Sequence, residues 1–380
     1  MSNSIKIAVA LSLFLVLICN SCKEDPAQPN PPTTTPTDSG IKDLTDITYS
    51  PTPKEIDRLE NFPIMEIPAD NPLTAEGIEL GRHLFFDPIL SANQQMSCAN
   101  CHLPTQAFTD NLAVSTGIDD IPGTRSSMAL FNVGYYTKGL FWDGSVVTLE
   151  EQALLPVEDP IELHHDWTDV VDDLREHELY PELFRKAFGI ENTDGITKEL
   201  AAKAIAQFER TIISGNSKYD RVVRGEEFFE DEEFNGWFMF FDVGGDLPDA
   251  ECGHCHNTPL FSTNDYFNNG IDSVPDLNSF KDLGLGEITN RLFDNGKFRA
   301  PTLRNIALTA PYMHDGRFET LEEVIDHYNE GVHYADNVDP LLLKPNGLGM
   351  NDQQKKDLLA FLHTLTDTSF VNNPAYQSPF

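Results

Sequence analysis

Hydrophobic residues along this chain recur mostly at the three-to-four-residue spacing of α-helices. Thr74 can cap a helix that runs to Phe86, and this helix ends before Pro88 because a residue that precedes proline avoids helical dihedral angles. A second helix begins after Thr197. The hydrophobic positions at helical spacing along it are Leu200, Ala201, Ala204, Ile205, Phe208 and Ile212.

The C-terminal part of the chain shows the same pattern. Thr320 and Glu323 form a capping box in front of a third helix, and Asn351 can cap a fourth. Alternating hydrophobic and polar positions, which are typical of β-strands, are scarce, and loops rich in Gly, Pro and Asn separate the helices. We therefore predict an all-α fold with little β structure.

A short hydrophobic run lies near the N-terminus. Residues 7–18 are hydrophobic but too few to span a bilayer comfortably, so the run resembles the central part of a secretory signal. Ser21 and Cys22, which follow it, resemble a bacterial lipoprotein cleavage site. We predict a lipoprotein signal peptide over residues 1–21 and lipidation of Cys22. An ordinary signal peptide with an incidental cysteine is the alternative.

A proline-rich stretch follows the predicted signal. Residues 26–40 read PAQPNPPTTTPTDSG and contain no large hydrophobic residue, so they have nothing to bury. We predict that residues 22–48 form a Pro/Thr-rich tether between a lipid anchor and a globular body. No later segment is hydrophobic for long enough to cross a membrane. The protein is therefore expected in the periplasm or cell envelope, held at a membrane only by its lipid anchor.

The charge of the chain argues against one class of partner. The 380 residues include 26 Lys+Arg and 61 Asp+Glu, which gives a formal net charge of −35. Such an acidic surface cannot neutralise phosphates, so we predict no binding of nucleic acid. The charge has two interpretations: a solvated, highly soluble surface, which composition favours, or the attraction of a cationic partner. The acidic run over residues 226–233 fits either interpretation.

Two of the three close cysteine pairs carry the same motif. Residues 98–102 read CANCH and residues 252–256 read CGHCH, and both match C-x-x-C-H, the attachment pattern of c-type haem. Cysteines three positions apart lie on one side of a helical turn, and the histidine that follows can ligate the iron. The pairs are too distant for a usual four-cysteine zinc site, and no βαβ pattern supports a thioredoxin-like motif. We predict two covalently bound haem c groups, held by Cys98, Cys101, His102, Cys252, Cys255 and His256.

Four further stretches are distinctive: LGRHLFFDP at 80–88, FWDG at 141–144, FRAPTLRN at 298–305 and LTAPYMHDG at 308–316. Together with the two cysteine motifs they resemble the bacterial di-haem cytochrome c peroxidases and their relative MauG, which oxidises a partner protein. The resemblance covers nearly the whole globular body. It implies two cytochrome c-like haem domains in tandem, over residues 49–215 and 216–370.

The resemblance also implies different roles for the two haems. The haem on His102 would be peroxidatic, the haem on His256 would take electrons from a donor, and Trp142 matches a tryptophan between them. In this family a glutamine and a glutamate ten positions apart assist peroxide cleavage, and Gln152 and Glu162 match that spacing. The predicted function is the reduction of hydrogen peroxide to water with electrons from a small redox protein such as cytochrome c.

Two departures from the peroxidases point toward MauG. Ile118 stands where better-known peroxidases have a histidine that blocks the peroxidatic iron, so we expect an iron that is open without reductive activation. Tyr328 matches the distal ligand of the second haem, where MauG also has tyrosine and the peroxidases have methionine. Met350 is the rival ligand, and His327, Met313 or no ligand complete the alternatives.

Members of this family also carry a calcium ion between the domains, and they are often dimers. Thr309 and Pro311 match two backbone carbonyl ligands of the calcium, whereas Ser126 replaces an asparagine ligand. Two other functions stay open. One is MauG-like oxidation of a protein or small-molecule substrate, and the other is non-enzymatic electron transfer by a di-haem carrier on the outer membrane.

Overall fold

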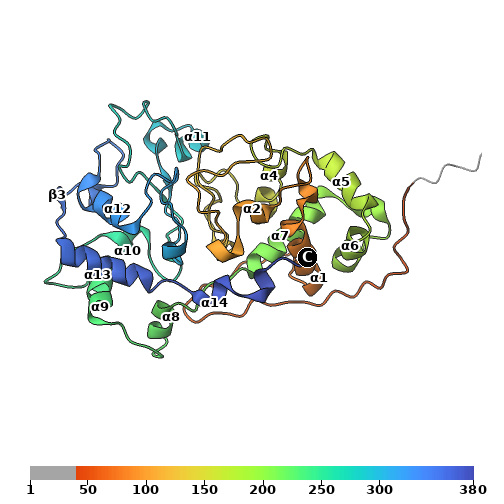
Figure 1. Cartoon of the computed structure of the whole chain (residues 1–380), viewed down its shortest axis with the longest axis horizontal. Helices are drawn as coiled ribbons and strands as arrows, with labels where there is room; N and C mark the ends of the chain where they lie inside the picture. The colour runs from red at the N-terminus through yellow and green to blue at the C-terminus, as the bar shows by residue number, and fades with distance from the viewer. Residues whose placement is uncertain (1–39) are drawn as a thin grey trace, which may run out of the picture. The chain divides into compact units, whose positions relative to one another are not determined.

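The computed structural model describes residues 40–380, and residues 41–380 form one compact unit (Figure 1). The predicted signal peptide, the predicted lipidation site Cys22 and most of the predicted tether lie outside the described residues. Within residues 40–380, no helix is both long and hydrophobic enough to cross a membrane. These residues are mostly helical, so the prediction of an all-α fold is confirmed.

Helices α1 and α7 form the centre of the N-terminal half. Thr74 caps α1 and Thr197 caps α7, each by accepting a hydrogen bond from the backbone N–H three residues later, as the sequence predicts. The two helices cross closely because Gly81 has no side chain, and a Cβ atom there would collide with the carbonyl oxygen of Ala204. The α-helices of this half are α1 (Ala75–Phe86), α2 (Cys98–Cys101), α3 (Leu149–Gln152), α4 (Leu155–Glu158), α5 (Trp167–Glu176), α6 (Tyr180–Phe188) and α7 (Lys198–Thr211).

Helices α9 and α13 pack against each other in the C-terminal half. Asn351 caps α13, and Thr320 with Glu323 forms the predicted capping box of α12. Beyond α12 the chain continues into a π-helical turn, His327–Gly331. The α-helices of this half are α8 (Lys218–Val223), α9 (Asp231–Phe240), α10 (Cys252–Cys255), α11 (Leu285–Thr289), α12 (Leu321–Asp326), α13 (Asp352–His363) and α14 (Thr368–Val371).

The β structure within residues 40–380 is limited to one small sheet, one further short strand and isolated bridges. Strand β1 (Tyr266–Phe267) pairs antiparallel with β2 (Phe298–Arg299), with Tyr266 opposite Arg299, and β3 (Pro345–Leu348) lies outside this sheet. Short 3₁₀ turns of three residues interrupt the loops. They are Pro88–Leu90, Pro104–Gln106, Val133–Tyr135, Thr193–Gly195, Leu292–Asp294, Ile306–Leu308, Pro340–Leu342 and Pro374–Tyr376.

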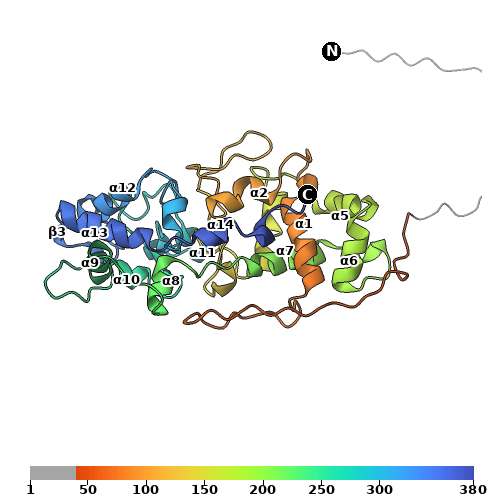
Figure 2. The same cartoon turned by 60° about the horizontal axis from the view of Figure 1, so that its bottom comes forward.

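Each half has its own hydrophobic core. One core lies among α1, α5, α6 and α7, and another lies among α9, α12 and α13. The C-terminal end of the chain then returns to the N-terminal half, where Phe370 and Tyr376 pack against Phe108 in a cluster that also contains Phe85 and Phe208. Figures 1 and 2 both show this segment running from α13 through α14 to the neighbourhood of α1.

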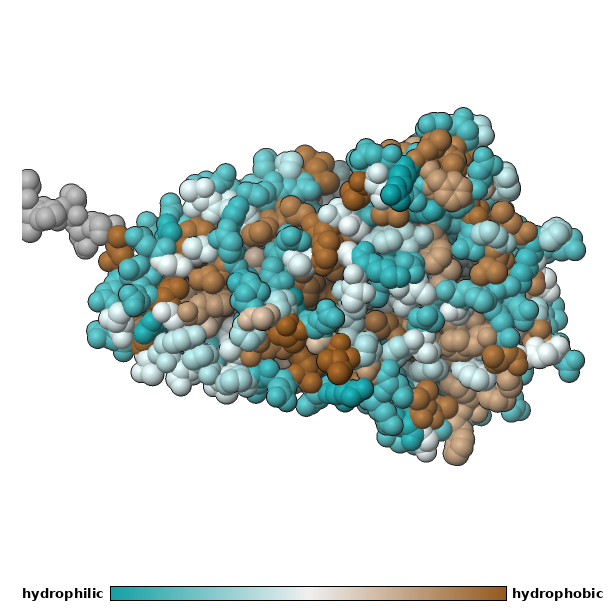
Figure 3. Space-filling view, turned by 180° about the vertical axis from the view of Figure 1, so that it is seen from behind, coloured by the Kyte–Doolittle hydropathy of each residue, from teal (hydrophilic) through white to brown (hydrophobic). Residues whose placement is uncertain are grey.

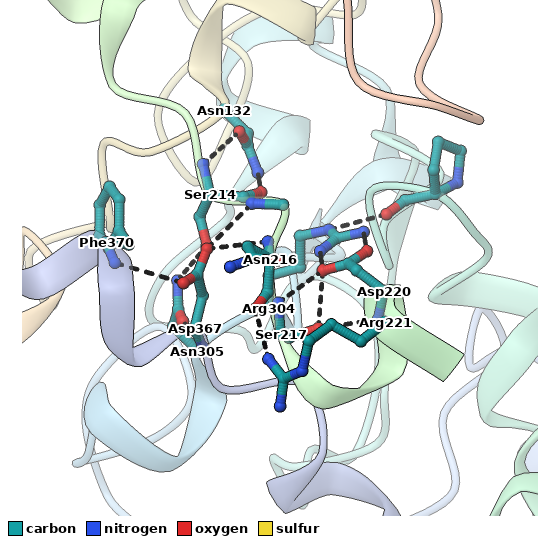
Figure 4. A network of polar contacts seen from close by, with 12 residues as sticks. Asn132, Ser214, Asn216, Ser217, Asp220, Arg221, Arg304, Asn305, Asp367 and Phe370 are labelled. Carbon is teal, nitrogen blue, oxygen red and sulfur yellow. Dashed lines mark hydrogen bonds and ion pairs between the residues drawn. The ribbon is translucent and has the colours of Figure 1, made fainter. Parts of the chain in front are cut away.

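A buried polar network holds the segment that connects the two halves (Figure 4). An oxygen of Asp367 accepts hydrogen bonds from the backbone N–H groups of Gly215, at 3.1 Å, and Asn216, at 2.9 Å. Asp220 and Arg304 form a buried ion pair with two N–O distances of 2.8 and 2.9 Å. Carboxylates of the C-terminal half therefore fix the position of the connection between the halves.

Candidate functional site

The first C-x-x-C-H motif forms the short helix α2 and the residue after it. Ser97 and Asn100 cap this helix, with the N–H of Ser97 donating to Asn100 Oδ1 at 2.8 Å. His102 follows, and its Nδ1 lies 3.0 Å from the carbonyl oxygen of Phe108. A proton on Nδ1 satisfies that carbonyl and leaves Nε2 free as a metal ligand. Burial lowers the pKa of His102, which favours the neutral, ligating form.

The second motif repeats this arrangement on α10. Nδ1 of His256 lies 3.0 Å from the carbonyl oxygen of Pro301 and 3.3 Å from that of Phe261. Burial lowers the pKa of His256 to about 4, so this imidazole is neutral at neutral pH. The two histidines therefore present Nε2 in the same way, one in each half of the chain.

The four cysteines of the motifs are free thiols, and none forms a disulfide. Burial raises the pKa of both Cys98 and Cys252 to about 12, so both thiols are protonated at neutral pH when nothing is bound to them. Cys98 packs beside the N-terminal core that contains Phe108, whereas Cys252 packs beside the C-terminal core that contains Phe240. Two separate sites, and no joint four-cysteine zinc site, follow from this placement.

A cavity of about 450 Å³ lies in the N-terminal half, which is a normal size for a cofactor site. Its walls are built by α2, by the loops on either side of α3 and α4, and by one face of α7. It brings together six residues that the sequence singles out from separate parts of the chain. They are Cys98, Cys101, His102, Trp142, Gln152 and Glu162.

Glu162 reaches this cavity from the loop after α4. Its side chain lines the cavity and keeps an exposed surface. Desolvation by the surrounding protein, together with the charge of Asp159, raises its pKa to about 7. A carboxyl group with this pKa can both accept and donate a proton near neutral pH. Ile118 lies beside it, with its N–H donating to the carbonyl oxygen of Glu162 at 2.9 Å, and its hydrocarbon side chain carries no ligand atom.

Trp142 connects the cavity to the C-terminal half. Its indole N–H donates to the carbonyl oxygen of Ser126 at 2.9 Å, which fixes the ring at the cavity wall. Its own carbonyl oxygen accepts a hydrogen bond, also 2.9 Å long, from the backbone N–H of Arg299 in β2. Trp142 is thus held in place by both halves.

Two cavity residues, Arg299 and Glu209, escaped the sequence analysis. Both are buried, and Arg299 Nη1 and Glu209 Oε2 each lack a hydrogen-bond partner. Burial raises the pKa of Glu209 to about 8. A haem carries carboxylates and a large apolar ring, so an unpaired arginine N–H in a mostly apolar cavity fits that group. In the sequence, the sign that could have pointed to Arg299 is its place in the distinctive FRAPTLRN stretch.

The proposed distal ligands of the second haem lie close to the second motif. Tyr328 lies in the π-helical turn. Burial raises the pKa of its hydroxyl to about 12, and the nearby side chains of Cys255 and Cys252 add to this increase. Asn269 Nδ2 donates to both the Tyr328 hydroxyl, at 3.3 Å, and Met313 Sδ, at 3.4 Å. Met350 is buried in the core against which Tyr328 packs. The candidates therefore share one region.

The residues predicted near a calcium ion lie where the two halves meet. Asn111 of the N-terminal half donates to the carbonyl oxygens of Leu308 and Ala310, on either side of Thr309. Its own Oδ1 is buried without a hydrogen-bond partner. Ser126 donates its hydroxyl to the carbonyl oxygen of Met313, two residues beyond Pro311. An oxygen-rich site is therefore compatible with this region.

Comparison with known proteins gives consistent matches. A model for the family of di-haem cytochrome c peroxidases matches residues 75–228. The chain is 34% identical over 298 residues to the methylamine utilization protein MauG of Methylorubrum extorquens. This alignment covers 78% of this chain and 80% of that protein. It is also 34% identical over 339 residues to the cytochrome-c peroxidase IdrP1 of a Pseudomonas species, covering 81% and 85% of the two chains.

A solved structure is similar as well. A crystal structure described as a MauG-like protein associated with microbial copper homeostasis is 35% identical to this chain. It superposes with a TM-score of 0.74 and covers 86% of this chain and 99% of its own. The likeness therefore extends over nearly all the residues that form the two cores.

Proposed function

Because the chain belongs to the di-haem cytochrome c peroxidase and MauG family, an oxidoreductase family with c-type haems, we propose that it reduces hydrogen peroxide to water. One observation carries this proposal: a single cavity contains a haem-attachment motif, the glutamine and the glutamate that the reaction needs. The electron donor would be a small redox protein such as a cytochrome c. The family assignment favours an enzyme over the alternative of a simple electron carrier.

The residues of the first site divide the work of holding the cofactor. Cys98 and Cys101 would form the two thioether bonds, His102 Nε2 would ligate the iron, and Arg299 would pair with a haem carboxylate. The bound haem would supply the iron at which peroxide coordinates and the electrons that break its O–O bond. The hydrogen bond from His102 to Phe108 fixes the orientation of the imidazole ring.

Proton transfer would be the task of Glu162. Its carboxylate would take a proton from one oxygen of hydrogen peroxide and give it to the other oxygen, which would leave as water. The Gln152 amide orients the peroxide by hydrogen bonding. The overall reaction, H₂O₂ + 2 e⁻ + 2 H⁺ → 2 H₂O, needs two one-electron donors, whose electrons would enter at the haem on His256 and pass near Trp142.

We further propose that the iron on His102 is open in the fully oxidised protein, because Ile118 cannot ligate it. Electron paramagnetic resonance of the purified, oxidised protein should show a high-spin ferric signal in addition to a low-spin one. A spectrum with low-spin, six-coordinate haem alone would overturn this proposal. The same spectrum tests Tyr328, because tyrosinate and methionine ligation of the second haem give different low-spin signals.

A second candidate function is MauG-like oxidation of a protein or small-molecule substrate, which Ile118 and Tyr328 favour. Steady-state turnover of peroxide with reduced cytochrome c separates the two functions. Rapid oxidation of the cytochrome supports the peroxidase. An oxidised form of the enzyme that decays slowly and does not accept electrons from the cytochrome supports the MauG-like function instead.

The remaining sequence predictions are part of the same proposal. Residues 1–21 would be removed and Cys22 lipidated, which would place the enzyme in the periplasm or cell envelope on a lipid anchor. Calcium would bind near Thr309 and Pro311, and the enzyme would act as a homodimer. Mass spectrometry of the N-terminal peptide, metal analysis and light scattering test these three points separately.

A further inference from the structure

The segment that leads into the second haem motif is both acidic and aromatic. Residues 225–251, here called the α9 segment, contain no Lys or Arg. Its ten acidic residues are Glu226, Glu227, Glu230, Asp231, Glu232, Glu233, Asp242, Asp246, Asp249 and Glu251. Its seven aromatic residues are Phe228, Phe229, Phe234, Trp237, Phe238, Phe240 and Phe241. Most acidic runs in proteins are only solvated, so a binding role for this segment depends on how its side chains are arranged in the structure.

Several hydrophobic side chains of the α9 segment lie on the surface. Phe228 is 83% exposed, Val243 is 54% exposed and Phe234 is 44% exposed. Phe234 stacks on Trp237, with ring centroids 5.9 Å apart and planes 5° from parallel, and contacts Phe238 at 4.4 Å. Figure 3 shows hydrophobic side chains among hydrophilic ones on the face opposite to that of Figure 1. Rigid aromatic groups gathered at a surface are typical of protein interfaces.

Unpaired carboxylates flank this aromatic group. Five acidic residues of the segment form ion pairs with nearby basic side chains, namely Glu226, Glu227, Glu233, Asp242 and Glu251. The other five are exposed and form no ion pair with any described residue. They are Glu230, Asp231 and Glu232 at the start of α9, and Asp246 and Asp249 in the loop after it. Phe234, Trp237 and Phe238 thus lie in the sequence between two groups of unpaired carboxylates, and Phe228 lies just before the first group.

Aromatic contacts connect this surface to the second haem motif. Trp237 contacts Phe241 at a centroid distance of 5.8 Å, and Phe241 contacts Phe261 at 6.3 Å. The carbonyl oxygen of Phe261 lies 3.3 Å from Nδ1 of His256, the predicted iron ligand. A protein bound over α9 would therefore sit a few packed side chains from the second haem.

We propose that the surface of the α9 segment is the docking site for a basic electron-donor protein. This proposal rests on the proposed peroxidase function. The aromatic rings supply the apolar centre of the interface, and the carboxylates attract a lysine-rich face and orient it. The donor would lose one electron at each encounter, and the haem held by His256 would accept it. Two encounters supply the two electrons that one molecule of peroxide consumes.

Binding to the oxidised holoprotein tests the proposal without turnover. The probe is a basic mitochondrial-type cytochrome c at low ionic strength, measured by surface plasmon resonance, and the comparison is the same cytochrome with acetylated lysines. The triple variant E230Q/D231N/E232Q should weaken binding at least about tenfold, and salt should weaken binding of the wild type. Phe228→Ala, at a side chain that is mostly exposed, should weaken it several-fold.

A matched control removes three other exposed, unpaired carboxylates on and after α5, as D169N/E176Q/E178Q. This control should bind the cytochrome like the wild type. The proposal is wrong if the control loses as much affinity as the α9 variant, if the α9 variant binds normally, or if acetylated cytochrome binds equally well.

Turnover then separates this proposal from the proposed function. With an uncharged small-molecule reductant, the α9 variant should reduce peroxide as fast as the wild type, and this result would show that the variant is folded and active. With the cytochrome as donor, the variant should lose activity. If the wild type binds the cytochrome at α9 but reduces no peroxide with either donor, the peroxidase function fails while the docking site stands. Loss of activity with both donors would contradict a role confined to docking.

Discussion

At the scale of single residues, Glu162 should control how the reaction depends on pH. Its carboxylate form accepts the proton of hydrogen peroxide, and its pKa is raised to about 7 by burial and by Asp159. The value of kcat/KM for peroxide should therefore rise with pH as Glu162 ionises and level off above about pH 7 to 8. Glu162→Gln should lower this value by about 10² to 10⁴-fold and remove the pH dependence, as measured by steady-state kinetics over pH 5 to 9.

Glu158 provides the control for this prediction. It lies on α4, four residues before Glu162, and is exposed outside the cavity. Glu158→Gln changes the charge of the protein by the same amount and should leave both kcat/KM and its pH profile unchanged. An unchanged profile in the Glu162 variant would remove that residue from the mechanism.

Single residues also show where sequence reasoning succeeds. Cys98, Cys101 and His102 are neighbours in the chain, so their motif could be recognised from spacing alone. Glu209 could not be recognised, because a glutamate in a helix is usually solvated, and only the packing of α7 turns it toward the cavity. Arg299 likewise acquires its place from the pairing of β2 with β1, which lies 32 residues earlier in the chain.

At the scale of elements, the attachment of α8 depends on one buried ion pair. Asp220, in the first turn of α8, binds Arg304 through two hydrogen bonds, and Ser217 caps the helix. Asp220→Asn should lower the free energy of unfolding by about 3 to 5 kcal/mol, since it leaves a buried guanidinium without its counter-charge. Chemical denaturation of the holoprotein, followed by circular dichroism, measures this loss.

A matched carboxylate-to-amide change tests whether burial is the cause. Glu182→Gln breaks the exposed pair between Glu182 and Lys186 on α6 and should cost less than about 0.5 kcal/mol. The Arg304 guanidinium also lowers the pKa of Asp220. The stabilisation by Asp220 is therefore complete above the usual carboxyl pKa of about 4 and is lost only as pH falls below it. Equal losses in the two variants at pH 7 would contradict this account.

The long helices could be predicted because their signals are local. Thr74, Thr197, Thr320 and Asn351 each cap a helix at the place that the sequence indicates. The π-helical turn after α12 carries no such signal. Its backbone depends on tertiary contacts, among them the hydrogen bonds of Asn329 with Met350.

At the scale of the whole molecule, the C-terminal segment stabilises the opposite half of the chain. Tyr376 is 7% exposed, packs against Phe108, and donates its hydroxyl hydrogen to the carbonyl oxygen of Thr211 at the end of α7. Tyr376→Ala should cost about 3 to 5 kcal/mol and speed hydrogen exchange in α7, as measured by mass spectrometry. Phe380→Ala, at a position that is 68% exposed, should change neither. Unchanged exchange in α7 of the Tyr376 variant would show that the two halves are stabilised independently.

The amino-acid sequence by itself determined the helices, the two haem-attachment motifs, the family and the acidic character of the chain. Each of these depends on residues that are close together in sequence or on simple composition. Only the tertiary structure decided that Trp142, Gln152 and Glu162 share one cavity with His102, that Arg299 reaches this cavity from the other half, and that exposed rings and free carboxylates meet at α9. The physical reason is that cavities and surfaces form from long-range packing, which no local spacing of residues can specify.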